Sequence, residues 1–427
     1  MTESSTLSSP TLHRTVLDNG LVVLVTENPV ADIISARIFV RAGSAFETPD
    51  QAGLFSLLMS LLTKGTQQLS SLEIAEAVES IGASLGSDAS ADYSLVSLKT
   101  VSADFPAMLK LAAEVLRSPS FPEAEVQLER RLTLQQIRSM QEQPFTVAFN
   151  HLRQAMYGDH PYALPGVGTE ASVAMLTRDR LEQAHRQYFR PDNTVVSIVG
   201  RIDPAKAVAL VEQVLGDWAV PQGPVPELSF PSVPVQGSRV AVPQDTNQSI
   251  VMVGYLAAPV KHPAYAGLKL LNTYLGNGLS SRLFVEMREK RGLAYDVSAF
   301  YPTRLGLSQF VAYMGTAPEN TPVALEGLCY ELERLCTTLL SPEEIQASKN
   351  KLLGQYALGK QTNAQIAQLN GWYETLGMGL EFDQDFQDAI AAVTAEEAQA
   401  VAQEFFNEPY ITLLGPASAV EPLVENV

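Results

Sequence analysis

Apolar residues along the chain recur with two different spacings, and each spacing predicts a different kind of element. Short runs rich in valine and isoleucine, such as those at 21–27 and 249–257, are typical of buried strands. Other segments have apolar residues on one side of a helix, and these lie at 71–82, 102–118, 122–143 and 341–359. In the first of them the apolar row is Leu72, Ala75, Val78 and Ile81. The pattern therefore predicts strands mixed with long amphipathic helices.

The order of these elements repeats along the chain. The first half begins with two strands and an apolar helix, at 21–27, 34–43 and 52–62. The second half begins in the same way, at 238–242, 249–257 and 264–276. Each half also closes with a helix followed by a strand. We therefore expect an α+β fold of two similar α/β domains, each a mostly antiparallel sheet covered by helices.

A proline-rich segment separates the two halves. Its prolines are Pro221, Pro224, Pro226, Pro231 and Pro234. Proline at this density removes backbone donors and favours an extended chain. We therefore expect a first domain at 1–220, a linker at 221–237 and a second domain at 238–427.

Charge narrows the range of partners. The formal net charge is −18, from 29 Lys and Arg against 47 Asp and Glu. An acidic surface argues against binding to nucleic acid or to an anionic membrane. It favours basic peptides as ligands, although acidic surfaces also simply keep cytosolic proteins in solution. No run of about 18 apolar residues predicts a membrane span, and the N-terminal segment lacks the pattern of a secretory signal.

The two cysteines, Cys329 and Cys336, lie in one predicted helix. Their spacing puts them about 10.5 Å apart along the helix axis, which is too far for a disulfide. We expect both to be reduced, as is usual in the cytoplasm.

Five segments resemble, in the expected order, landmarks of the pitrilysin-like and mitochondrial-processing-type zinc peptidases, the inverzincins. The segments are TVLDNGLVVLVTENP (15–29), RAGSAFETPDQAGLFSLLMSLLTKGT (41–66), YGDHPYALPGVGTEASV (157–173), YFRPDNTVVSIVGRID (188–203) and YLGNGLSSRLFVEMREKRGLAY (274–295). The resemblance covers nearly the whole chain. It implies a peptidase fold of two similar domains and a zinc-binding helix in the first of them.

The zinc site of this family needs His-x-x-Glu-His on one helix and a distal glutamate. Two histidines at i and i+4 share a helix face and hold Zn²⁺, and the glutamate between them is the general base. Aligned without a gap, this chain has Ser56, Met59 and Ser60 at the motif positions and Gln136 at the position of the distal glutamate. These side chains are poor zinc ligands. We therefore expect no metal in this chain.

A relocated metal site is not predicted either. No two of the five histidines stand at i and i+4; they are His13, His151, His160, His185 and His262. His160 belongs to a His-Pro-Tyr loop motif, and we expect it to fix that loop rather than to bind a metal.

The second half keeps an arginine and a tyrosine at the family's spacing, Arg288 and Tyr295. In the family such a pair comes from the half without zinc and reaches the substrate across the chamber. A guanidinium and a phenol are suitable donors to the oxygen on which negative charge develops during peptide hydrolysis. Spacing alone favours a structural interpretation, with Arg288 as a surface helix charge and Tyr295 as a strand core residue. The resemblance of the flanking residues favours the functional interpretation.

The resemblance thus implies the non-catalytic subunit of a heterodimeric zinc metallopeptidase, inactive alone. A similar subunit with an intact His-x-x-Glu-His would bring the zinc, and unfolded peptides would be the substrates. The alternative is an inactive scaffold or peptide-holding protein with the same fold.

Overall fold

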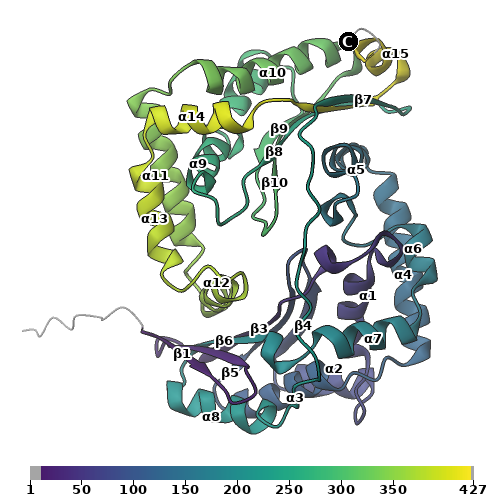
Figure 1. Ribbon diagram of the computed structural model, residues 1–427, viewed down its shortest axis with the longest axis vertical. Helices are drawn as coiled ribbons and strands as arrows, with labels where there is room; N and C mark the ends of the chain where they lie inside the picture. Colours follow the sequence, from purple (N-terminus) through teal and green to yellow (C-terminus); the bar gives the residue numbers. More distant parts are fainter. Residues whose placement is uncertain (1–10, 425–427) are drawn as a thin grey trace, which may run out of the picture. The chain divides into compact units, whose positions relative to one another are not determined.

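The computed structural model describes residues 11–424, which form two compact units (Figure 1). Within the described residues, the first unit comprises residues 11–134, 166–228 and 358–380. The second comprises residues 135–165, 229–357 and 381–424.

The first unit is built on a six-stranded sheet with the order β1-β2-β6-β3-β5-β4. Strands β2 and β6 are parallel, and the other neighbouring pairs are antiparallel. In chain order the strands are β1 (Leu12–Val16), β2 (Val22–Glu27), β3 (Ile33–Val40), β4 (Ser84–Ala89), β5 (Ser94–Val101) and β6 (Thr194–Gly200).

The second unit has a five-stranded sheet with the order β7-β11-β8-β10-β9. Here β7 and β11 are the parallel pair, and the remaining pairs are antiparallel. The strands are β7 (Ser238–Pro243), β8 (Ser249–Ala257), β9 (Asp296–Phe300), β10 (Ser308–Thr316) and β11 (Tyr410–Gly415). Apart from β1, the two sheets therefore share one topology, with the parallel pair in the same place. The prediction of two similar, mostly antiparallel α/β domains is confirmed.

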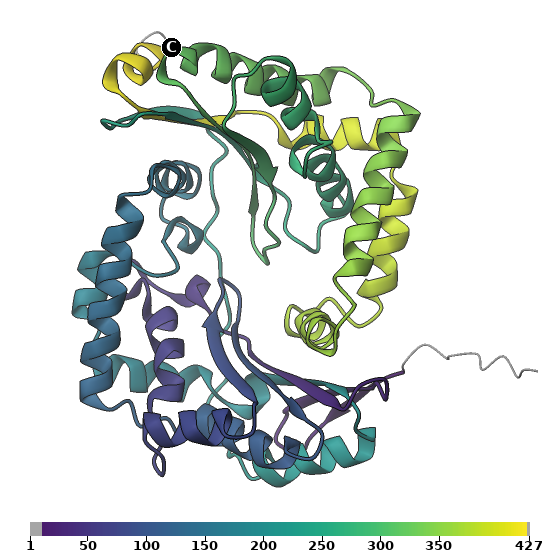
Figure 2. The same cartoon turned by 180° about the vertical axis from the view of Figure 1, so that it is seen from behind.

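Helices cover both sheets (Figures 1 and 2). In the first sheet, helix α3 contacts β5 and helix α8 contacts β2. In the second sheet, helix α10 contacts β8 and β10. Those of the first unit are α1 (Leu54–Leu61), α2 (Ser71–Glu79), α3 (Phe105–Arg117), α6 (Glu170–Met175), α7 (Arg178–Tyr188) and α8 (Pro204–Leu215). Those of the second are α9 (Tyr265–Gly276), α10 (Thr321–Thr337), α11 (Pro342–Leu358), α13 (Phe382–Ala392), α14 (Ala395–Phe405) and α15 (Ala417–Val420). Helix α4 (Glu123–Gln141) runs from the first unit into the second.

Each unit also contains one helix from the other half of the sequence. Helix α12 (Asn363–Thr375) lies on β3 and β6, and helix α5 (Pro144–Tyr157) lies on β8 and β11. Glycines permit both close approaches, since a Cβ at Gly371 would stand 2.2 Å from the ring of Phe39. A Cβ at Gly254 would stand 3.0 Å from the sulfur of Met156. The compact units therefore do not coincide with the two sequence halves.

The helix predicted at 71–82 forms, but it buries a different face. Ile74 and Val78 are buried, whereas Leu72 is 68% exposed and Ile81 is 37% exposed. A row at three-residue steps drifts around a helix of 3.6 residues per turn, so only i and i+4 neighbours stay on the packed side. The helix was predicted correctly, but of the predicted apolar row only Val78 is buried.

The proline-rich segment has no helix or strand from 218 to 237, and the boundary between the units falls within it. The beginning of this segment is hydrogen-bonded to the first unit. The buried guanidinium of Arg190 donates to three of its carbonyls at 3.0–3.3 Å, those of Pro221, Gly223 and Pro224. Among the described helices, none is long and apolar enough to cross a bilayer.

Candidate functional site

Helix α1 carries Ser56, Met59 and Ser60, the positions that the sequence alignment matches to the zinc motif, and Glu47 fixes the beginning of this helix. The two side-chain oxygens of Glu47 accept the N–H groups of Gly53 and Phe55, both at 2.8 Å. Gly53 has φ +89°, and a Cβ there would stand 2.6 Å from the Val167 carbonyl, so glycine is required. Burial raises the pKa of Glu47 to about 8, and the two N–H donors act in the opposite direction.

The aligned zinc positions on α1 do not form a ligand set. Ser56 and Ser60 lie half-buried on one side of the helix, and the hydroxyl of Ser60 donates to the Leu57 carbonyl at 2.8 Å. Met59 is 1% exposed and packs into the core. A buried thioether in place of the glutamate offers no base for activating water. Residues of this kind do not fit Zn²⁺.

Gln136, at the distal glutamate position, is exposed on α4. Another carboxylate of the same helix, that of Glu129, pairs with Lys64, which follows α1 in the chain, at 2.9 Å. In the described residues, no group of three or more His, Cys, Asp or Glu side chains is placed to hold a metal ion.

His160 holds its loop, as its motif predicted. Its Nδ1 accepts the N–H of Tyr162 at 3.0 Å, and its ring stacks on Phe230 at 4.8 Å. Burial lowers the pKa of His160 to about 4, so the ring is neutral at pH 7.

Arg288 lies on a π-helix in the second unit, η6 (Phe284–Lys290). Wide turns of this type are frequent at functional sites. The guanidinium lies over the ring of Phe284, 5.1 Å from its centroid, and the residue is exposed. The nearby carboxylate of Glu286 is already paired with Arg282 at 3.0 Å and Lys290 at 2.8 Å. Among the described residues, Arg288 has no carboxylate partner.

Tyr295 follows Arg288 after a tight turn and leads into β9. The turn uses Gly292 at φ +63°, whose N–H bonds to the Arg288 carbonyl at 3.2 Å. The Tyr295 backbone N–H is anchored to the Gly315 carbonyl at 2.9 Å, while the residue is 65% exposed. Tyr295 is therefore not a core residue of the strand. Within the described part of the chain, no hydrogen bond to its hydroxyl is found.

The structure thus keeps the sequence-predicted residues on separate elements. Ser56, Met59 and Ser60 share α1 in the first unit, and Gln136 lies on the part of α4 assigned to the second. Arg288 and Tyr295 stand on either side of one turn in the second unit. Sequence reasoning missed Glu47, which positions α1, and its only signal was its place in the segment that resembles the zinc-binding stretch.

Two family models match the chain. The model described as Insulinase (Peptidase family M16) matches residues 22–170, and the model described as Peptidase M16 inactive domain matches residues 175–352. The chain belongs to peptidase family M16.

Curated relatives and solved structures agree with this assignment. The chain is 28% identical to an uncharacterized zinc protease of Streptomyces coelicolor over 95% of this chain and 90% of that protein. It is 27% identical to an uncharacterized zinc protease of Bacillus subtilis over 95% of this chain and 98% of that protein. The crystal structure of a peptidase M16 inactive domain from Pseudomonas fluorescens aligns with a TM-score of 0.89 at 26% identity, covering 95% of this chain and 98% of that one.

Proposed function

We propose that this chain is the non-catalytic subunit of a two-chain zinc metallopeptidase that acts on unfolded peptides. The observation that carries the proposal is a contrast between two sites. The first unit has no ligand set at the family's zinc positions, while the second unit keeps Arg288 and Tyr295 with exposed, unpaired polar groups. A chain of this kind is inactive alone and becomes useful beside a similar subunit with an intact His-x-x-Glu-His.

In this proposal, Arg288 and Tyr295 act on the partner's active site. Zinc bound in the partner supplies an activated water molecule. As the peptide bond is attacked, negative charge grows on the carbonyl oxygen, and the guanidinium and the phenol donate hydrogen bonds to it. Both groups are suited to this role, since arginine stays charged and tyrosine keeps its proton at neutral pH.

The two cysteines bear on the compartment in which the complex would work. Cys329 and Cys336 are both free thiols on α10. Free thiols persist in reducing compartments. This supports a cytoplasmic location for the complex.

The test is reconstitution with a similar chain that carries His-x-x-Glu-His, followed by hydrolysis assays on a fluorogenic unfolded peptide. We expect little cleavage by either chain alone and strong cleavage by the mixture. A partner that cleaves equally well alone would make this chain a scaffold or a peptide-holding protein instead.

A further inference from the structure

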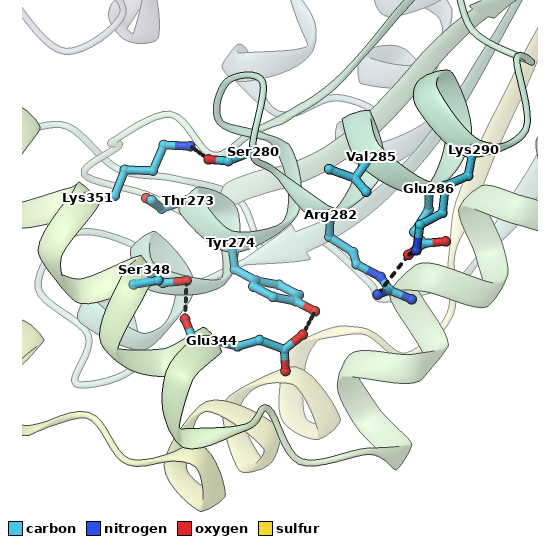
Figure 3. A pocket seen from close by; sticks show the side chains of 11 residues that line it. Thr273, Tyr274, Ser280, Arg282, Val285, Glu286, Lys290, Glu344, Ser348 and Lys351 are labelled. Carbon is cyan, nitrogen blue, oxygen red and sulfur yellow. Dashed lines mark hydrogen bonds and ion pairs between the residues drawn. The ribbon is translucent and has the colours of Figure 1, made fainter.

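The second unit contains a pocket of about 290 Å³ (Figure 3). Two of the residues that line it, Glu286 and Lys290, flank Arg288 in the sequence. Its walls are the end of α9, the loop 277–281, helix η6 and helix α11. Pockets for drug-sized ligands have volumes of about 300–1,000 Å³. This one lies at the lower limit, so it suits a single terminal group of a ligand rather than a long segment.

The carboxylates in this pocket are already neutralised. Glu286 is held by Arg282 and Lys290, and Arg282 also pairs with Glu331 at 2.8 Å. Glu344 accepts the Tyr274 hydroxyl and the Ser341 N–H, both at 2.8 Å, and its carboxylate pairs with Arg334 at 3.6 Å. Neighbouring donors and cations lower the pKa values of both lining glutamates, so each is ionised and compensated.

Lys351 is the cation in the pocket that has neutral partners only. Its ammonium donates to the Asn277 carbonyl and to the Ser280 hydroxyl, the latter at 3.3 Å. Figure 3 shows it extending from α11 toward Ser280. The loop backbone comes close to it, since a Cβ at Gly278 would stand 3.3 Å from Nζ. Partial burial lowers the pKa of Lys351, as expected for an ammonium without a counter-ion.

We propose that this pocket binds the carboxylate at the C-terminal end of a peptide, with Lys351 as its counter-ion and Ser280 as a second donor. One ammonium without a counter-ion matches the single charge of a carboxylate, whereas a phosphate group carries about −1.5 to −2 at pH 7. Val285 and Ala347 in the lining, and Leu279 on the adjacent loop at 74% exposed, offer apolar contact to the last side chain. The proposal rests on the proposed role with peptides and adds a site that selects free peptide ends.

The test uses the isolated full-length chain and isothermal titration calorimetry. The probes are the tripeptide Ala-Ala-Leu as the free acid, the same peptide as its C-terminal amide, and inorganic phosphate. One charge-assisted hydrogen bond is worth about tenfold or more in affinity. We expect the free acid to bind at least tenfold more tightly than the amide and more tightly than phosphate.

Variants assign the binding to this pocket. Lys351→Met should weaken binding of the free acid at least tenfold, and Lys351→Arg should retain most of it. Lys349→Met is the matched control on the same helix, where the amine donates to the Ala391 carbonyl at 2.7 Å, and it should bind as the wild type does. Thermal unfolding followed by circular dichroism checks that each variant folds.

Several outcomes would overturn the proposal: equal affinity for acid and amide, tighter binding of phosphate, no binding to the folded wild type, or unchanged binding by folded Lys351→Met. Because no partner subunit is present, these outcomes are independent of the reconstitution assay. Failure of reconstitution, in turn, leaves the calorimetry unaffected.

Discussion

Tyrosine and phenylalanine differ by one hydroxyl group, which makes Tyr295→Phe a direct test of the proposed donor to the partner's site. Tyr295 is 65% exposed, so removing its hydroxyl group leaves the core unchanged. Loss of one donor to a developing oxyanion typically costs about 10²–10³ in rate. We expect kcat of the reconstituted pair to fall by about tenfold to a thousandfold with little change in KM, because the bond forms mainly in the transition state.

The matched control is Tyr330→Phe, another tyrosine on the surface of the second unit, 56% exposed on α10. It should leave kcat unchanged, and a pull-down should show that both variants still bind the partner. Full activity of a pair that carries Tyr295→Phe together with Arg288→Ala would rule out the donor role.

Glu47 gives a second prediction at this scale, through the pH dependence of stability. Its pKa is raised by burial to about 8 in the folded chain, above the usual value of 4.5. The folded state therefore binds the proton more tightly, and the stabilisation is complete below about pH 4.5 and lost as pH rises toward 8. We expect the free energy of unfolding of the wild type to decrease between pH 5 and 8 more steeply than that of Glu47→Gln. The difference between the two slopes should be up to about 1.4 kcal/mol per pH unit.

Urea unfolding of both proteins across this pH range would measure the difference. Identical slopes for the wild type and Glu47→Gln would mean that the two N–H donors keep the carboxylate ionised despite its burial.

Single residues also show where sequence reasoning about the site ends. The replacements at Ser56, Met59 and Ser60 were readable because a motif with fixed spacing has few tolerated side chains. Lys351 and Glu47 carried no such motif. Their importance depends on which carboxylates, carbonyls and N–H groups lie near them after folding, and those partners come from distant segments or from a buried turn.

At the scale of elements, the contact between α12 and the first sheet can be tested at Gly371. An added methyl there meets the Phe39 ring at 2.2 Å, and overpacking of a core typically costs about 1–3 kcal/mol. We expect Gly371→Ala to lower the free energy of unfolding by about that amount.

Gly354→Ala on α11 is its control, because a Cβ there meets nothing within 4 Å. Alanine is favoured over glycine in a helix by about 1 kcal/mol, so this variant should be slightly more stable than the wild type. Denaturant unfolding measures both changes. A Gly371→Ala protein as stable as Gly354→Ala would show that α12 does not pack on β3 as described.

The elements themselves were largely predictable, since their apolar spacing is local. The helix expected at 341–359 is α11. The Glu344 carboxylate accepts the Ser341 backbone N–H at 2.8 Å, and the Ser341 hydroxyl accepts the Glu344 backbone N–H at 3.2 Å. The strands expected at 34–43 and 249–257 are β3 and β8. The exchange of α5 and α12 between the halves was not predictable. Their apolar faces predict that both helices pack against other elements, but nothing in the sequence indicates which sheet each helix contacts.

At the scale of the whole molecule, the zinc-motif positions of α1 and the proposed donor pair lie in different units, and only the donor pair keeps its functional side chains. Helix α1 of the first unit aligns with the zinc helix of the family, and the described residues offer no metal ligand set there, while the second unit keeps the proposed donor pair. Activity would then be a property of two chains, whereas the zinc would be held by the partner chain alone. The metal content of purified proteins separates these contributions without any assay of catalysis.

We therefore expect the isolated chain to retain no stoichiometric zinc after mild chelation, as measured by elemental analysis. Hydroxyl, thioether and neutral amide groups at Ser56, Met59, Ser60 and Gln136 bind Zn²⁺ weakly compared with imidazole and carboxylate. The reconstituted pair should hold about one zinc per two chains, the usual content of a single catalytic site. As a control, the same chelation should leave zinc in the partner alone. About one tightly held zinc in the isolated chain would show that a ligand set exists outside the aligned positions, and the proposal of a non-catalytic subunit would then have to be abandoned.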